Sequence, residues 1–110
     1  MSDYSKAGLT EVDELRQKVN QSPGNFFFRF SLAQLLSKNN LCSEAIEQLC
    51  ICLEAREDWM MAVLMKAKLE LVLGRKNDAA DSLSKTIELA KSQGHDDPLA
   101  EASHLLKSLN

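Results

Sequence analysis

Apolar residues recur every three or four positions along most of this chain, which is the spacing of one face of an α-helix. The pattern breaks at four groups of residues that favour turns, Pro23-Gly24, Asn39-Asn40, Gly74 and Gly94, and Asp58, which can cap a helix, marks a fifth boundary. We therefore expect an all-α fold of about six helices, joined by short turns that make neighbours antiparallel. The expected helices cover about residues 11–21, 26–38, 44–56, 59–73, 77–93 and 98–109.

Residues that can cap a helix precede most of these segments. Their side-chain oxygens can accept hydrogen bonds from the first free amides of a helix. The candidate caps are Thr10, Asn25, Ser43, Asp58 and Asp97. Residues 1–9 are polar and carry no period, so a flexible N-terminus is expected there, followed by one helical domain over residues 10–110.

The segment 59–73 is apolar on nearly all sides, unlike its neighbours. A helix of this kind is buried on most sides, so it is expected at the centre of the fold. Lys66 and Glu70 form its polar notch. They stand four residues apart and are expected to pair with each other.

The chain also repeats itself at a spacing of 34 residues. The identical pairs are Ala33 and Ala67, Leu35 and Leu69, Ala45 and Ala79, Leu49 and Leu83, and Glu54 and Glu88. A fixed period of this length indicates helix pairs that bury their apolar faces by stacking on one another. The two units are expected over about residues 25–58 and 59–92, with flanking helices over about 11–21 and 98–109.

These units resemble tetratricopeptide repeats, whose 34-residue helix pairs carry small and large residues at set places. The matching residues of the first unit are Leu32, Ala33, Leu36, Ala45, Leu49 and Cys52. In the second unit Ala67, Ala79 and Leu83 agree, whereas Lys66 and Glu70 stand where the family has large apolar residues. The resemblance implies a right-handed stack of antiparallel helix pairs.

A weaker resemblance covers the last third of the chain. Residues 77–80, 94–99 and 105–109 are similar to the helical C-terminal region of thioredoxin-like co-chaperones, which act as holdases. The chain has no Cys-x-x-Cys motif and no alternation of strands and helices. Only the helical part of that family could therefore apply here.

The first resemblance also implies a binding surface, because the first helix of each unit lines the concave face in that family. The residues at those places are Phe27, Phe30, Gln34, Lys38, Met61, Leu64, Lys68 and Leu71. This apolar floor suits an amphipathic helix or an apolar peptide, with Lys38 and Lys68 holding acidic groups. The alternative is that a terminal helix folds over the floor and makes it core. For Trp59, a wedge between the two units is the preferred interpretation over an interface anchor.

Composition and charge argue against several other functions. The net charge is −3, with 13 Lys and Arg against 16 Asp and Glu, so neither nucleic acid nor a membrane surface is an expected partner. The three cysteines lie together at positions 42, 50 and 52 and are expected to be reduced packing residues. His95 and His104 have no Cys or acid at ligand spacing, so no metal site is expected. No cofactor motif is present.

The sequence therefore predicts a non-catalytic protein-interaction module of the cytoplasm, an adaptor or a co-chaperone-like domain, with another protein as its partner. The first alternative is a structural module that forms a homodimer through the same apolar face. More remote alternatives are a small helical enzyme with a pocket between helices, or a regulator that binds nucleic acid. Neither the polar convergence nor the basic face that these would need is seen in the sequence.

Overall fold

The computed structural model describes the backbone of residues 3–109 and the side chains of residues 10–109. The described chain consists of six α-helices and contains no strand. They are α1 (Asp3–Gln21), α2 (Phe26–Lys38), α3 (Cys42–Ala55), α4 (Met60–Val72), α5 (Lys76–Gln93) and α6 (Asp96–Ser108). The predicted all-α fold is confirmed.

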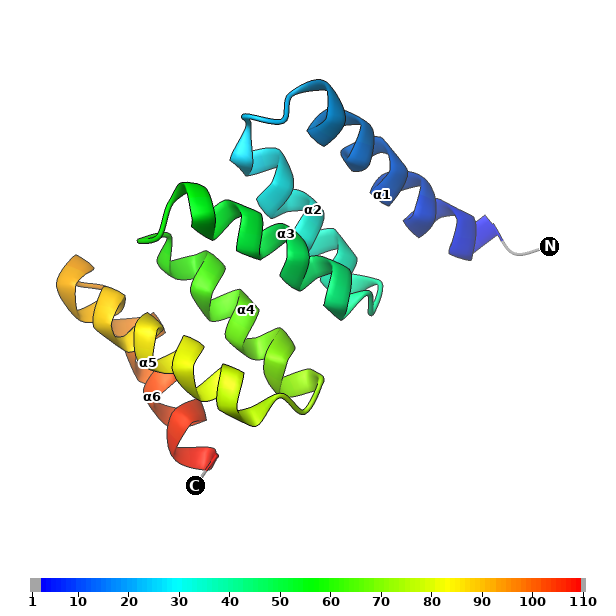
Figure 1. Cartoon of the computed structure of the whole chain (residues 1–110). Coiled ribbons are helices and arrows are strands. Elements are labelled where there is room, and N and C mark those ends of the chain that lie inside the picture. The colour runs from blue at the N-terminus through cyan, green and yellow to red at the C-terminus, as the bar shows by residue number, and fades with distance from the viewer. Residues whose placement is uncertain (1–2, 110) are drawn as a thin grey trace.

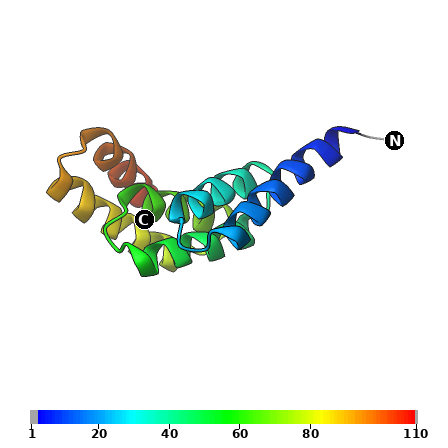
Figure 2. The ribbon, with the colours of Figure 1, turned by 90° about the horizontal axis from the view of Figure 1, so that it is seen from above.

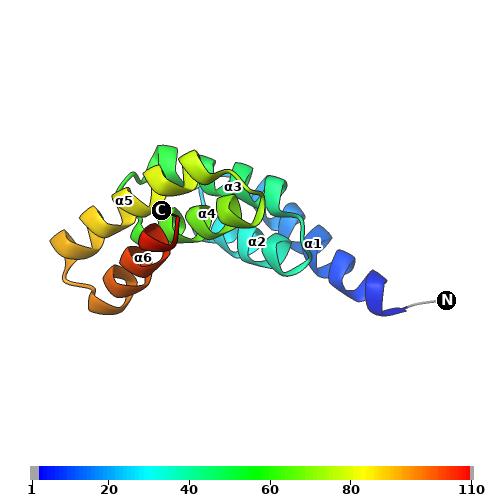
Figure 3. The same ribbon diagram turned by 90° about the horizontal axis from the view of Figure 1, so that it is seen from below.

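Each helix packs against the next one in the chain, so the six form a stack that runs from α1 to α6 (Figure 1). The stack measures 44 × 31 × 22 Å and is arched. Figure 2 shows the arch from above, with α1 and α6 at its two ends. In Figure 3, α3 and α5 follow the outer side of the arch, while α2, α4 and α6 lie toward its inner side. A concave surface of this stack is therefore formed by these three inner helices.

The helix bounds repeat at the spacing of the sequence. Helices α2 and α4 begin at Phe26 and Met60, and α3 and α5 begin at Cys42 and Lys76. Each pair of starting residues is 34 positions apart. The alanines of the repeat are fully buried, which lets neighbouring helices approach closely, and so are Leu49 and Leu83. The buried residues common to both units are Ala33 and Ala67, Ala45 and Ala79, and Leu49 and Leu83.

The turns after α2 and α4 have the same geometry, although their residues differ. Asn40 (φ 62°) and Gly74 (φ 75°) both lie in the left-handed region that ends many helices. The following amides close the turns, with Leu41 donating to the Leu36 carbonyl at 2.9 Å and Arg75 to the Glu70 carbonyl at 2.8 Å. Asparagine is one of the few side chains that tolerate this conformation.

Only one of the expected caps is confirmed. The Asn25 side chain accepts hydrogen bonds from the amides of Phe27 and Phe28. The other four assignments are wrong. Helices α1, α3 and α6 begin before Thr10, Ser43 and Asp97, so these residues lie inside the helices, and α4 begins at Met60, so Trp59 rather than Asp58 stands at its cap position. Leu41, Trp59 and His95 stand at the start of α3, α4 and α6 without a side-chain cap.

The first helix is longer than expected, because α1 begins at Asp3 rather than near residue 11. Residues 3–9 of the segment predicted to be flexible belong to this helix, and residues 1–2 lie outside the described residues. Val12, Leu15 and Val19 face the core and pack with residues of α2 and α3. Helix α1 therefore covers the first unit.

Helix α4 is the centre of the core, as its composition predicts. Seven of its residues are buried, and they contribute to all three apolar clusters. One cluster joins it to the first unit, and the others join it to α5 and α6. The two units are thus a single packed body.

Candidate partner-binding surface

The predicted floor is accessible in its first half. Phe27 is 66% exposed and Met61 is 46% exposed. Gln34 and Lys38 are exposed on α2, and Phe30 is half-buried. We call Phe27, Phe30, Gln34, Lys38 and Met61 the open floor. It lies on the inner helices α2 and α4.

An aromatic cluster supports one end of the open floor. The Trp59 ring stacks on Phe30 with ring centroids 4.8 Å apart and meets the edge of Phe27 at 5.6 Å. The Arg56 guanidinium also lies over the Trp59 ring, 5.1 Å from its centroid. Trp59 thus joins α2 to the start of α4, which confirms its predicted place between the units. These contacts hold Phe27 in position while leaving most of it exposed.

A cavity of about 600 Å³ opens beside this cluster. Its lining comes from the turn before α2, the first residues of α2 and the turn before α4. The lining residues are Ser22, Gly24, Asn25, Phe26, Phe27, Arg56 and Trp59. Arg56 was not among the site residues predicted from the sequence. Its position at the boundary between the units, three residues before Trp59, is a partial signal for it.

The second half of the predicted floor is closed, which corrects the assignment of Leu64. Leu64 is 2% exposed and lies in one apolar cluster with Ala102 of α6. Leu71 is half-buried against the same cluster. The reason is that α6 packs its leucines onto this part of α4 and α5, so a terminal helix does cover the floor here. The leucines of α6 in this cluster are Leu105 and Leu106.

The two predicted lysines also differ. Lys68 forms an ion pair with Glu101 of α6, so its charge is already balanced. Lys38 has no ionic partner within the described part of the chain. Lys68 is therefore not free to bind an acidic group of a partner, and that role for Lys38 stays a prediction.

A polar cluster is buried inside the second unit. Glu70 is 3% exposed and accepts a hydrogen bond from the Lys66 ammonium at 2.9 Å and another from the Ser82 hydroxyl at 2.6 Å. Lys66 also donates to the Ser82 hydroxyl at 3.3 Å. The predicted pairing of Lys66 with Glu70 is confirmed. Because both carboxylate oxygens have partners, the charge of Glu70 is compensated in the core.

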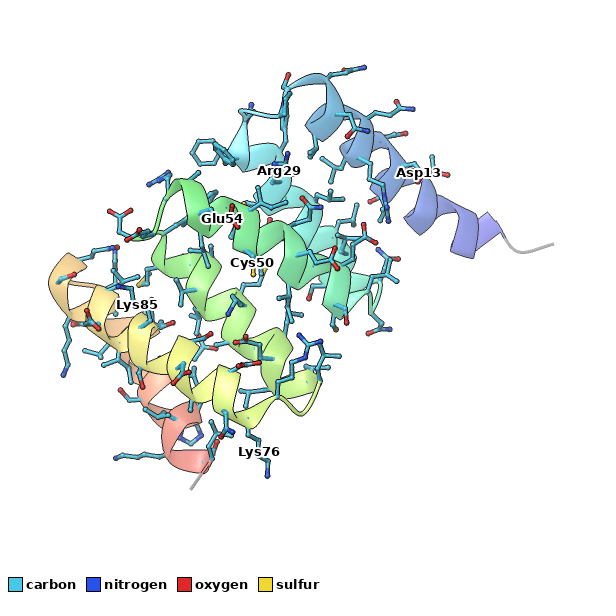
Figure 4. The ribbon with its side chains drawn as sticks, in the orientation of Figure 1. Asp13, Arg29, Cys50, Glu54, Lys76 and Lys85 are labelled. Carbon is cyan, nitrogen blue, oxygen red and sulfur yellow. The ribbon has the colours of Figure 1, made fainter. Side chains whose placement is uncertain are left out.

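The outer side of the first unit carries two arginines that tie α1 and α2 to α3. Arg16 forms a pair with Glu44 at 2.9 Å, and Arg29 donates to the Gln48 amide oxygen at 3.1 Å. Figure 4 shows Arg29 on α2 beside α3, away from Lys85 and Lys76 of α5. Such partly exposed pairs contribute little to stability, so their main effect is to fix how the helices meet.

The cysteines are packing residues in this structure. All three are free, and Cys52 is fully buried, with its thiol donating toward the Phe26 carbonyl at 3.7 Å. Burial raises the pKa of the Cys52 thiol, and the nearby Arg29 charge opposes this only in part. The thiolate of Cys52 is therefore disfavoured at neutral pH.

The described residues contain no group of three or more His, Cys, Asp or Glu side chains placed to hold a metal ion. None of the described helices has the length and hydropathy that a membrane-spanning segment needs.

Comparisons with known proteins give structural matches only. No family model matches this chain. No curated protein matches it either. A solution structure of a tetratricopeptide repeat domain protein from Salinibacter ruber has a TM-score of 0.72 and 27% identity. The match covers 80% of this chain and 89% of the Salinibacter ruber chain. A crystal structure of such a domain protein from the same organism has a TM-score of 0.70, also at 27% identity, and covers 77% of this chain and 94% of its own.

A third structure is PcrH in complex with the chaperone binding region of PopD. Its TM-score is 0.82, and the match covers 96% of this chain and 84% of that one, at 14% identity. At this identity the match concerns the fold. The resemblance to thioredoxin-like co-chaperones is not shown by these comparisons. The six-helix stack, the 34-residue repeat and the neighbours agree that this chain has a fold like that of tetratricopeptide repeats.

Proposed function

We propose that this chain is a non-catalytic protein-interaction module whose open floor binds an apolar or amphipathic segment of another protein. The observation that carries the proposal is the exposure of Phe27 and Met61 on the two inner helices, with Phe27 also lining a cavity of about 600 Å³. Exposed large apolar side chains beside a cavity are typical of interaction surfaces.

The length of the surface limits what it accommodates. Phe27 and Lys38 are 11 residues apart on α2, which corresponds to about 17 Å at a rise of 1.5 Å per residue. This span accepts about five residues of an extended segment or about three turns of a helix. The occupant is therefore a short segment.

The neighbouring structures support a binding role for this type of fold. PcrH has a closely similar arrangement of helices and was solved with the chaperone binding region of PopD. We propose the general role, binding a segment of another protein, for this chain as well. The identity of the partner is not transferred, because the two sequences share only 14% of their residues.

A homodimer through the same face is a less favoured interpretation. The open floor carries Lys38 and no acidic side chain, and Arg56 lies at its other end. A two-fold contact places the same surface on both copies, so two floors face to face would bring these cations together. The charge pattern therefore favours a different protein as partner.

We propose that the module is not an enzyme. None of the residues lining the cavity beside Trp59 is a His, Cys, Lys, Asp or Glu that could transfer protons near neutral pH. The Ser82 hydroxyl and the Lys66 ammonium are both engaged by the buried Glu70. The free cysteines suit a reducing compartment such as the cytoplasm.

The test uses the full chain as bait for a displayed library of random 12-residue peptides. We expect selected peptides to bind with micromolar affinity and to lose at least tenfold with the double variant Phe27→Ala/Met61→Ala. Leu41→Ala is the control, because it removes an exposed apolar side chain at the turn between α2 and α3. If no peptide is selected, or if the double variant binds like wild type, the proposal is wrong. A dimer mass in solution that Phe27→Ala abolishes would favour the homodimer instead.

A further inference from the structure

We infer that the cavity beside Trp59 is an anchor subsite, which takes one large apolar side chain of the partner and binds an adjacent carboxylate through Arg56. This inference rests on the proposed function and specifies the chemistry of the partner. It differs from the sequence-based expectation, in which Lys38 and Lys68 hold the acidic groups. The anchor end is marked by the aromatic cluster and the other end by Lys38.

The apolar half of the subsite is formed by the exposed ring of Phe27 and the half-buried rings of Phe26 and Trp59. Phe27 is 66% exposed, and the ring contacts with Trp59 hold it at the mouth of the cavity. The cavity of about 600 Å³ lies within the range of roughly 300–1,000 Å³ that is common for small-ligand sites. It can therefore hold one large side chain and part of the adjoining main chain. Covering these rings would remove apolar surface from water, which favours binding.

The charged half of the subsite is Arg56. Its guanidinium stacks on Trp59, an arrangement that leaves the N–H groups at its edge able to donate. Arg56 is exposed and takes part in none of the ion pairs among the described residues. A carboxylate matches the planar guanidinium with two parallel hydrogen bonds. The subsite thus offers a preoriented cation without an internal counter-charge.

The surrounding charges also favour an acidic partner. The one acidic residue of α2 and α4 is Glu70, which is buried and fully bonded. Glu57 follows Arg56 but lines a different cavity with Leu53 and Val63, and Asp58 does not line the cavity beside Trp59. The whole chain has more acidic than basic residues, whereas the lining of this cavity contains one basic residue and no acidic one. Arg56 is therefore the one charged residue that lines the subsite, which favours an acidic group in that part of the partner.

Gly24 offers a way to block the subsite without distorting the fold. It lines the cavity, and a Cβ atom added to it would meet nothing within 4 Å. Its φ angle lies outside the left-handed region, so a side chain can be added there without backbone strain. Gly24→Leu should fill the cavity from its wall.

The experiment uses peptides selected with wild-type chain from the random 12-residue library. Trp59 is the only tryptophan, so its fluorescence reports binding at this place. We expect the peptides to be enriched in a large apolar residue next to Asp or Glu. Arg56→Gln and Gly24→Leu should each weaken binding about tenfold, whereas Arg75→Gln, which removes an exposed cation before α5, should change it less than twofold.

A double-mutant cycle identifies the contact. Replacing the acidic peptide residue with its amide should weaken binding to wild type about tenfold but should not weaken binding to Arg56→Gln further. The inference is overturned if amide peptides bind as tightly as acidic ones, or if Gly24→Leu binds like wild type. If peptide binding is then still weakened by Phe27→Ala/Met61→Ala, the proposed function stands without the anchor subsite. If that double variant also binds like wild type, the proposed function is wrong as well.

Discussion

The two repeat units have the same helical frame but use it differently. In the first unit the inner surface stays open, with Phe27 two-thirds exposed and Phe30 half-buried. In the second unit Leu64, which stands 34 residues after Phe30, is buried against α6. The interiors differ as well, because Leu36 of the first unit is replaced by Glu70 in the second. Both side chains are buried at equivalent places.

The difference shows that position in a repeat does not by itself determine role. Helix α6 packs its leucines against α4 and α5, so the inner surface of the second unit becomes core. Nothing equivalent covers Phe27 among the described residues. The first unit, together with Met61 at the start of α4, thus supplies the open floor, and the rest of the second unit with α6 closes the stack. The polar outer faces of α1 and α6 complete both ends, as terminal helices of a repeat array require.

The largest effect is expected from transferring the polar position of the second unit to the first. Leu36→Glu would bury a carboxylate where Leu32 and Gln48 stand at the places of Lys66 and Ser82. With no cation to pair with it, the variant should lose more than about 4 kcal/mol of unfolding free energy or fail to fold. Urea denaturation followed by circular dichroism measures this. Leu36→Met is the control, and a loss of less than 1.5 kcal/mol is expected for it.

The next effect separates the closed and open halves of the inner surface. Leu64→Ala should lower the unfolding free energy by about 3 kcal/mol, because it leaves a cavity beneath α6. Phe27→Ala should cost less than about 1 kcal/mol, because most of the ring is already in water. Both are measured by urea denaturation. Equal losses for the two variants would mean that the surface around Phe27 is core too.

A smaller effect compares the turns that end α2 and α4. Gly74→Ala should cost about 1 kcal/mol, because alanine is strained at a φ of 75°. Asn40→Gly, at the equivalent place of the first unit, should be neutral or stabilise by up to about 1 kcal/mol. In thermal denaturation, the melting temperature should therefore fall for Gly74→Ala and should rise or stay the same for Asn40→Gly. A stable Gly74→Ala would contradict the left-handed turn.

The smallest effect is chemical and does not alter the fold. Because burial raises the pKa of the Cys52 thiol, iodoacetamide at pH 8 should modify Cys42 and Cys50 well before Cys52. Stability should also fall as the pH rises above about 9, since the unfolded chain then ionises this thiol more readily than the folded one. Mass spectrometry of time points identifies the modified cysteines. Early modification of Cys52 would show that the first unit opens readily.

The sequence was sufficient to predict the frame of the molecule. Matches such as Ala33 with Ala67 and Leu49 with Leu83 depend on close helix packing, which repeats with the 34-residue period. The cap at Asn25 and the pairing of Lys66 with Glu70 are local along the chain, and both were predicted correctly.

The state of the floor could not be predicted because it depends on contacts distant in sequence. Leu64 is buried by residues about 40 positions away, and Lys68 is paired with Glu101 on another helix. Periodicity gives the face on which a residue lies but does not show whether a terminal helix covers that face. The contact of Arg56 with the Trp59 ring is likewise seen only in the folded structure.

The most direct test of the proposed binding surface is NMR shift mapping of the isotope-labelled full chain with a peptide selected from the random library. We expect the largest shifts at the Trp59 indole, the Phe27 and Phe30 rings and the Met61 methyl group, with little change at Leu64 and Leu105. Shifts confined to α3 and α5, or centred on Leu64 and Leu105, would contradict the assignment of the open floor as the binding surface.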